Sequence, residues 1–389
     1  MKMKDMTAIV GVGDVELENG KVKNGMSVLQ IQALAAKSAL EDAGLEKKDV
    51  DGIFVAGNWG TPGVGAHPSA VVAEYLGITP KYLDSTNIGG SSFEAHVGHA
   101  AAAIQAGKCE VALIVFGSTQ RSQKSRSLDG RPPFLTMQYE TPFGLPFPAG
   151  AYAMATHRHM HQYGTTPEQL AEVAVSARKW AQLNPQATLR DPLTVDEVLN
   201  SPMICDPLRK LDCCLVTDGA GAVVIVSAER AGDCRKAPVW VLGQGESQSH
   251  WSIQAMPDLT TSSAAQSGKT AFEMAGVTHD DIDVLEIYDS FTITPLITLE
   301  ALGFCKPGES GPLVANQRTA PGGDLPMNTN GGGLSYAHPG MYGIFLLIEA
   351  VRQLRGECDL RQVVDAKIAL VNGTGGQLSA TSVCILGRD

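Results

Sequence analysis

The chain has 389 residues, of which 44% are hydrophobic and 18% charged, with 42 glycines and a formal net charge of −11. This length is sufficient for two or more core-forming halves, and the composition is typical of a soluble α/β protein with many tight turns. No run of Lys or Arg exceeds two residues. Because a nucleic-acid interface needs a basic stripe, the sequence argues against nucleic-acid binding.

The cysteines and the apolar runs indicate the cellular compartment of the protein. None of the eight cysteines forms a C-x-x-C pair, so we expect neither a zinc ribbon nor another metal site in this chain. Reduced cysteines beside apolar stretches are typical of cytosolic proteins. The N-terminus lacks the apolar region of a signal peptide, and no apolar run approaches the ~20 residues of a membrane span. We therefore expect a soluble protein in the cytoplasm, without membrane contact.

The first half of the chain predicts alternating helices and strands. Residues 39–55 are typical of a helix closed by a glycine, followed by a short turn and a strand. The segment 84–93 predicts a strand end and a turn of small residues, which leads into a helix over 95–106. A buried strand over 111–116 follows. The turn at Asn87 therefore lies between a strand and a helix.

An insertion over about 121–205 interrupts this pattern. It begins with polar, proline-rich sequence, including Arg131–Phe134 and Pro142–Pro148, and then becomes helical. Thr166-Pro-Glu-Gln169 is a capping box with proline at the first helical position, so it predicts a helix through Leu183. We expect the insertion to cover a site and to hold a long ligand. The first half resumes over 212–227 with a glycine-containing turn and a buried strand.

The sequence contains an internal duplication. Residues 271–287 repeat the pattern of residues 39–55, with identical Ala, Glu, Ala, Gly, Asp and Asp in register. A second match aligns Gly89-Gly…Ala95-His-Val-Gly98 with Gly331-Gly…Ala337-His-Pro-Gly340. Two matching βα halves predict a pseudo-twofold, in which the glycine turns face each other across one site. The expected domains are 1–120 with 206–236, the insertion 121–205, and 237–389.

These features together resemble the thiolase superfamily along nearly the whole chain. They include the elbow at Asn87, Thr217-Asp-Gly-Ala-Gly-Ala222 and Asn330-Gly-Gly-Gly-Leu-Ser-Tyr-Ala-His-Pro-Gly340. Tyr163–Gln169 and Asn184-Pro185 are similar to the lipid-transfer or sterol-carrier branch. The resemblance implies an α/β fold with five layers (αβαβα) and a homodimer. It further implies a small partner with an OB fold and a zinc ribbon.

The catalytic residues of that family are largely replaced in this chain. The nucleophilic cysteine of the elbow is Asn87, which cannot form a thioester. The family's oxyanion histidine is Tyr288 in Tyr288-Asp-Ser-Phe291, and Val371–Gly376 lacks the second catalytic cysteine. Only His338 remains. Chemistry through a covalent acyl-enzyme is therefore disfavoured, because neither cysteine is supplied.

The resemblance instead implies the retro-aldolases of steroid side-chain degradation. These split a β-hydroxyacyl-CoA into a ketone or aldehyde and a shorter acyl-CoA, so coenzyme A enters as part of the substrate and no other cofactor is expected. The reaction needs a base for the hydroxyl, a donor to the thioester enolate and an acid for Cα. Thiolytic cleavage of a β-ketoacyl-CoA and a non-catalytic acyl-CoA-binding subunit are the alternatives.

Several residues are candidates for this work. His338 is the first choice as thioester-oxygen donor or proton shuttle. Among the tyrosines, Tyr288 is the first candidate for proton transfer, provided that its neighbours move its pKa towards neutrality. The alternative is that Tyr288 only packs in the core. Tyr342 is ranked above Tyr336, because four residues after His338 it would stand one helical turn away. Either tyrosine is otherwise a core aromatic.

Asp289 is expected either to orient Tyr288 or to cap the following helix. Four glycines are predicted to approach the CoA thioester with their backbone: Gly331, Gly332, Gly375 and Gly376.

Overall fold

One sheet of ten strands organises the computed structural model, which describes residues 6–59, 67–124 and 138–388. The strand order is β12-β13-β14-β11-β1-β10-β7-β4-β6, with β5 pairing β7 at the side. The strands of the first half are β1 (Thr7–Asp14), β4 (Gly52–Phe54), β5 (Asn58–Trp59), β6 (Tyr82–Asp84), β7 (Val111–Ser118) and β10 (Gly219–Ser227). Those of the second half are β11 (Val239–Gln248), β12 (Val284–Ile287), β13 (Ile368–Gly375) and β14 (Ala380–Gly387).

The two halves of the sheet are related by a pseudo-twofold at the β1–β11 contact. Outward from β1, the strands β10, β7 and β4 pair antiparallel, antiparallel and parallel. Outward from β11, the strands β14, β13 and β12 repeat this series. The junction itself is short, with the pairs Ala8↔Trp240 and Ile9↔Val239. β1 therefore lies between β10 and β11. This arrangement confirms the duplication.

A glycine bulge is repeated in both halves. The register shifts just before Gly11 in β1 and just before Gly243 in β11. A Cβ at either glycine would overlap a helix backbone carbonyl, that of Ala39 in α1 (Val28–Ala43) or that of Ala271 in α9 (Ala264–Ala275). Each helix then ends at a left-handed glycine, as the sequence predicted, with φ of 74° at Gly44 and 69° at Gly276.

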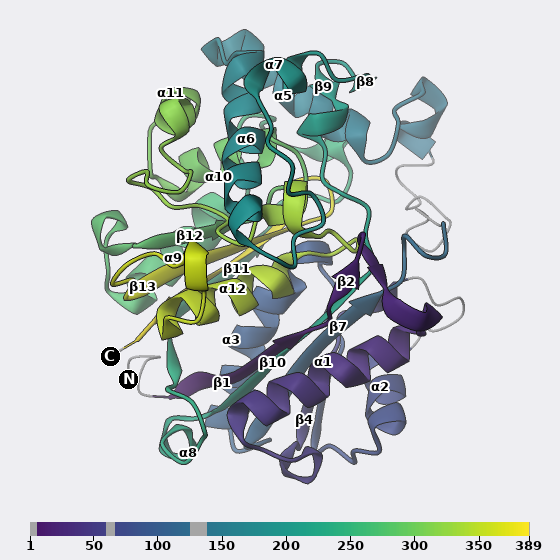
Figure 1. The fold of residues 1–389 in the computed structure, drawn as a ribbon, viewed down its shortest axis with the longest axis vertical. Coiled ribbons are helices and arrows are strands. Elements are labelled where there is room, and N and C mark those ends of the chain that lie inside the picture. Colours follow the sequence, from purple (N-terminus) through teal and green to yellow (C-terminus); the bar gives the residue numbers. More distant parts are fainter. Residues whose placement is uncertain (1–5, 60–66, 125–137, 389) are drawn as a thin grey trace.

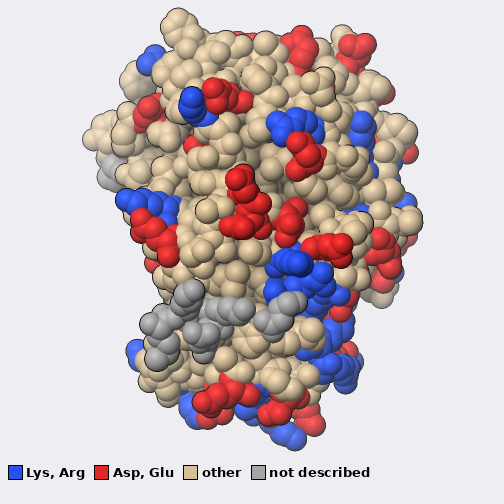
Figure 2. Space-filling view, turned by 90° about the vertical axis from the view of Figure 1, so that its left-hand side faces the viewer, with Lys and Arg blue, Asp and Glu red and all other residues tan. Residues whose placement is uncertain are grey.

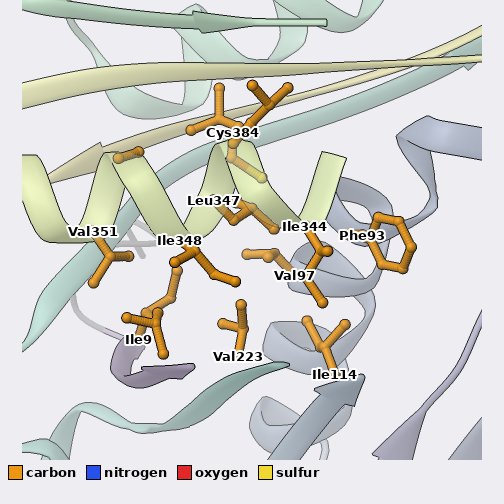
Figure 3. Close-up of a cluster of buried hydrophobic side chains, with 14 of the residues drawn as sticks. Ile9, Phe93, Val97, Ile114, Val223, Ile344, Leu347, Ile348, Val351 and Cys384 are labelled. Atoms are coloured by element: carbon orange, nitrogen blue, oxygen red, sulfur yellow. The ribbon is translucent and has the colours of Figure 1, made fainter. Parts of the chain in front are cut away.

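The helices form the outer and central layers, as the thiolase resemblance implied. α1 packs on β1, β10 and β7, and α9 packs on β11 and β14 (Figure 1). Between the two half-sheets lie α3 (Ser92–Gln105) and α12 (Gly343–Arg355). Figure 3 shows side chains of both central helices meeting residues of the first half-sheet, with Cys384 on the opposite side. The order of layers is therefore αβαβα.

The insertion lies at the top of Figure 1 and packs on the second half. Its helices are α5 (Ala149–Tyr163), α6 (Pro167–Leu183) and α7 (Val195–Leu199). The capping box predicted at Thr166 and Gln169 is present at the start of α6. α6 contacts the loop before α12: the Asn184 side-chain amide donates to the Asn330 carbonyl over 2.9 Å. The predicted proline-rich segment Arg131–Phe134 lies outside the described residues.

The second sequence match is not in register in the structure. Ala95 and His96 lie inside α3, whereas Ala337 and His338 lie in the loop before α12 begins at Gly343. The two copies therefore share a glycine turn followed by a helix, but His96 is not the counterpart of His338.

Further short elements connect these layers. They are β2 (Leu17–Glu18), β3 (Lys21–Val22), α2 (Pro68–Leu76), β8 (Met203–Cys205), β9 (Leu208–Arg209), α8 (Ala228–Ala231), α10 (Ile293–Leu302) and α11 (Ser310–Val314). Among the described residues, no helix has the length and apolar character needed to span a membrane. On the face drawn in Figure 2, basic side chains are interspersed with acidic ones.

Candidate active site

The elbow at Asn87 meets the C-terminal glycine loop at Gly375 and Gly376, and not the turn at Gly331 that the duplication predicted. The Asn87 side-chain oxygen accepts the amide hydrogen of Gly89 over 3.1 Å, and Gly89 has a φ of 70°. A Cβ on Gly89 would lie 2.8 Å from Cα of Gly375 and 2.9 Å from N of Gly376. Only glycine permits this approach together with this φ. The turn then enters α3 with Asn87 at its exposed tip.

Tyr288 and His338 form a hydrogen-bonded pair behind this elbow. Tyr288 directly follows β12, and its hydroxyl lies 3.0 Å from Nε2 of His338. The same hydroxyl oxygen accepts the amide hydrogen of Tyr342 over 3.2 Å. The Tyr288 ring covers Gly90, where a Cβ would lie 2.5 Å from the hydroxyl oxygen. The structure thus brings together the elbow and two of the predicted residues.

The protonation state of Tyr288 differs from the one that the sequence analysis required. Tyr288 is only 4% exposed. Burial, followed by the nearby Cys214 and Tyr152, raises its pKa well above the ordinary value rather than towards neutrality. Tyr288 is therefore a neutral phenol at pH 7. Because its tyrosinate form is unfavourable, the hydroxyl can give up its proton only while it accepts a second proton from another group. His338 is the partly exposed member of the pair.

Tyr342 is close to the pair but does not stand where the sequence analysis placed it. The chain between His338 and Tyr342 is not helical, because Pro339 and Gly340, with a φ of 93°, interrupt it. The expectation of one helical turn is therefore wrong. Tyr342 is the N-cap of α12, and its ring stacks on His338 with centroids 6.2 Å apart. Its hydroxyl donates to the Asn330 side chain over 2.7 Å.

Tyr336 faces away from the pair. Its hydroxyl donates to Asp14 over 2.7 Å, and Asp14 forms a salt bridge with Arg352 over 2.7 Å. All three side chains line a small polar void together with Glu349 and Arg361. Tyr336 is therefore a core aromatic whose hydroxyl joins the loop before α12 to β1.

Asp289 holds the loop that carries His338. Its carboxylate accepts the amide hydrogens of Gly333 over 2.6 Å and Leu334 over 3.3 Å. Burial raises its pKa to about 7, although these amide bonds lower it. The following helix α10 has Thr292 as its N-cap, so Asp289 is not its cap. Of the two roles expected, capping is wrong, and orientation acts through the loop rather than on Tyr288 directly.

The four predicted glycines divide into two groups. Gly375 and Gly376 border a pocket of about 170 Å³ that opens beside the elbow. This pocket is lined by Asn87, Ile88, Gln248, Trp251, Gly375, Gly376, Ser379 and Ala380. Gly331 instead packs on α6, where a Cβ would lie 2.7 Å from that of Ala181, and a Cβ on Gly332 would overlap the Asp289 carboxylate. These two glycines shape the His338 loop.

Two neighbours of the pair were missed by the sequence analysis. Cys214 is one of the groups that raise the pKa of Tyr288, after burial. Glu94, in the first turn of α3, is fully buried, and burial raises its pKa to about 8. The only sequence signal for Glu94 was an acidic residue within an apolar helix start. Among the described residues, no group of three or more His, Cys, Asp or Glu side chains is arranged to hold a metal ion.

Comparisons with known proteins agree with this architecture. The family model described as "Thiolase, N-terminal domain" matches residues 7–229, and "Thiolase C-terminal domain-like" matches residues 245–388. The "Acetyl-CoA acetyltransferase" of Methanothermobacter thermautotrophicus is 33% identical, over 99% of this chain and 100% of its own. The "17-hydroxy-3-oxo-4-pregnene-20-carboxyl-CoA lyase" of Mycobacterium tuberculosis is 35% identical, over 99% and 100% respectively.

Among solved structures, "Ltp2-ChsH2(DUF35) aldolase" is similar over 99% of this chain and 98% of its own, at 33% identity and a TM-score of 0.88. Overall identity does not separate acetyltransferase from lyase, since 33% and 35% are nearly equal. The residues at the site must decide between these reactions.

Proposed function

The chain belongs to the thiolase family, and from this premise we propose that it is a carbon–carbon lyase. It cleaves a β-hydroxyacyl-CoA by a retro-aldol reaction into a ketone or aldehyde and a shorter acyl-CoA. One observation carries this proposal: Asn87 occupies the nucleophile position, while a tyrosine–histidine acid–base pair stands behind it. Such a site lacks an acyl acceptor but retains the groups for proton transfer.

The pair performs the reaction as a relay. The β-hydroxyl proton enters the pair as the Cα–Cβ bond breaks and its electrons move into the thioester enolate. Tyr288 passes its own proton to Nε2 of His338 when it receives another, so a buried tyrosinate never accumulates. The pair then returns one proton to Cα, and the protons balance. His338, stacked on Tyr342 and partly exposed, meets the thioester side and stabilises the enolate oxygen.

The site residues favour the lyase over the acyltransferase, and named lyase and aldolase relatives support that choice. Both the lyase relative and the aldolase structure align over nearly the full length of this chain. Coenzyme A is then bound as part of the substrate, and the pocket beside Gly375 and Gly376 is where we place the arm of CoA that leads to the thioester. The eight free cysteines favour a reducing compartment, the cytoplasm.

Two kinds of partner complete the proposed assembly. The edge strand β6 places the half-exposed Leu83 at the end of the sheet, and pairing of this edge with a second copy would form a homodimer. A small OB-fold, zinc-ribbon protein is the second partner, supported by the aldolase structure named with a DUF35 component. The chain is purified from its native source together with whatever it binds. The mass of the intact complex tests the homodimer, and mass spectrometry of the co-purified proteins and acyl-CoA tests the second partner.

Mass balance tests the reaction itself. The chain, with and without the co-purified partner, is incubated with matched β-hydroxyacyl-CoA and β-ketoacyl-CoA substrates. A retro-aldolase releases a carbonyl compound and an acyl-CoA in equal amounts without consuming free CoA. Cleavage that consumes one free CoA per turnover would replace the proposal with a thiolase. No turnover of any substrate, with or without the partner, would identify a non-catalytic acyl-CoA-binding subunit.

A further inference from the structure

Glu94 is a buried carboxyl group without a use in the relay described above. It lies in the first turn of α3 and has no exposed surface. Neither of its carboxyl oxygens has a hydrogen-bond partner among the described residues. Burying a charged carboxylate without a donor is strongly unfavourable, so the group resides there as a neutral acid. Burial accordingly raises its pKa to about 8.

The surrounding backbone makes room for this carboxyl group. A Cβ on Gly343, at the start of α12, would lie 2.6 Å from both carboxyl oxygens of Glu94, and a Cβ on Gly373 in β13 would overlap one of them. Neither glycine has a positive φ, so conformation alone does not require glycine at either position. The two glycines leave space for one side chain, and that side chain is Glu94. The carboxyl group therefore occupies a formed cradle.

This cradle adjoins two residues that contact Tyr288 of the catalytic pair, namely Tyr342 and Gly90. Gly343 follows Tyr342, whose amide donates to the Tyr288 hydroxyl. A Cβ on Gly343 would also overlap the carbonyl of Gly90, the residue that the Tyr288 ring covers. Glu94 is also the smallest of the contributions that raise the pKa of Tyr288, after burial.

Few titratable groups face Glu94. Tyr288 approaches from the end of β12, and the thiol of Cys384 on β14 donates to the Glu94 carbonyl over 3.3 Å. From β11, Glu246 acts on Cys384. α12 and β13 present glycines. No described basic side chain contributes to the pKa of Glu94, and the effect of burial outweighs that of its own backbone amide, which favours the ionised form.

We propose that the Glu94 side chain, held in its cradle next to the Tyr288–His338 pair, must be uncharged for turnover. The proposal rests on the proposed function, because it concerns the transition state of the retro-aldol reaction. Negative charge grows there on the β-oxygen and on the thioester oxygen. A buried carboxylate beside Tyr288 repels this charge in a medium of low dielectric, whereas a neutral acid does not.

The pH profile of Glu94→Gln tests this requirement. The neutral form exists below the pKa, so wild-type kcat is full at neutral pH and falls as the pH rises through about 8. The glutamine amide is nearly isosteric and never ionises. We expect Glu94→Gln to keep kcat and KM at pH 7 and to lack this alkaline decline, which leaves it about tenfold more active than wild type one pH unit above the pKa.

The matched control is Glu300→Gln. Glu300 is also buried, but it is paired with His159 and Ser310, away from the site, so its variant should retain the wild-type pH profile. The proposal is overturned if Glu94→Gln keeps the alkaline decline of wild type. It is equally overturned if this variant loses most of its kcat at every pH, since the ionisable proton itself would then be needed.

An infrared titration separates this proposal from the proposed function and needs no turnover. In the full wild-type chain without substrate, a protonated carboxylic acid band should persist at pH 7 and titrate near pH 8. Isotope labelling of glutamate assigns the band to that residue type, and its loss in Glu94→Gln assigns it to Glu94. Absence of the band at pH 7 overturns the proposal even if lyase activity is found. The presence of the band supports a neutral Glu94 at pH 7 even if the substrate is wrongly assigned.

Discussion

The hydroxyl of Tyr288 lies 3.0 Å from Nε2 of His338, although the two residues are 50 positions apart in the chain. Tyr288 is fixed by the end of β12, and His338 by a loop that Asp289 holds through two amide hydrogen bonds. The acid–base pair is therefore assembled from two separately anchored segments. Changes on either segment should affect proton transfer before they affect binding.

Removing the Tyr288 hydroxyl should abolish most of the activity. Tyr288→Phe keeps the ring over Gly90 but breaks the bond to His338, and general acid–base catalysis is worth ~100- to 10,000-fold in kcat. Steady-state kinetics on a folded variant provide the measurement. Tyr336→Phe is the matched control: it loses a buried hydrogen bond to the ionised Asp14, so it should lower the free energy of unfolding by about 2 kcal/mol and leave kcat unchanged. Undiminished kcat in Tyr288→Phe would assign Tyr288 a packing role.

Changes at His338 should distinguish catalysis from binding. His338→Ala removes the donor to the enolate oxygen, and the loss of one such donor costs about 3 kcal/mol in the transition state. We expect kcat to fall roughly 100- to 1,000-fold while acyl-CoA affinity, measured by calorimetry, changes little. His338→Asn should recover part of the loss, since its amide still donates. If His338→Ala instead weakened acyl-CoA binding and kept kcat, His338 would not stabilise the enolate, and its loop would have only a structural role.

A larger side chain at the elbow should lower catalytic activity more than it lowers the stability of the fold. Gly90→Ala places a Cβ 2.5 Å from the Tyr288 hydroxyl oxygen, so the tyrosine must shift away from His338. We expect kcat to fall strongly, with a smaller loss of thermal stability. Gly232→Ala is the control, because Gly232 has helical φ and ψ and a Cβ there meets no atom within 4 Å. A Gly90→Ala variant as active as Gly232→Ala would contradict the assigned position of the pair.

No covalent acyl-enzyme should form during turnover. Asn87 cannot carry an acyl group, and the thiol of Cys214, which contributes to the pKa of Tyr288, has no assigned role in the relay. Intact-mass spectrometry after incubation with substrate should show the unmodified chain, both in wild type and in Cys214→Ser. A stoichiometric acyl adduct that disappears in Cys214→Ser would identify a relocated nucleophile and exclude the proposed mechanism.

The buried acid should also make stability depend on pH. The pKa of Glu94 is raised in the folded state, so between pH 4.5, its ordinary value, and about 8 the folded chain binds more protons than the unfolded one. This contribution is full below pH 4.5 and is lost at about 1.4 kcal/mol per pH unit as the pH rises. Glu94→Gln should therefore gain stability over wild type between pH 5 and 8 in chemical denaturation. A constant difference across this range would contradict the buried neutral acid.

The opposite slope is expected for the control Glu300→Gln. The pKa of Glu300 is lowered because hydrogen bonds from His159 and Ser310 outweigh the effect of burial. Its contribution is present above the ordinary pKa and is lost as the pH falls, so the variant should lose stability most at neutral pH.

The sequence predicted those features that arise from local patterns. The repeat of α1 and α9 was visible because each helix ends at a glycine in the left-handed conformation. The elbow was visible because small residues separate a strand from a helix. The roles of Tyr336 and Asp289 were not visible, because their partners are set by tertiary contacts: Asp14 is 322 positions from Tyr336, and Gly333 is 44 from Asp289.

The position of β1 between β10 and β11 has a consequence for synthesis on the ribosome. β1 ends at Asp14, but its partners begin only at Gly219 and Val239, about two hundred residues later. At ~5–20 residues per second, the first strand waits roughly 10–40 s with both edges unpaired. Its apolar sequence is then a template for contacts with other nascent chains. Chains that terminate before Gly219 should aggregate or remain bound to chaperones, whereas the full-length chain, in which β1 has both partners, should not.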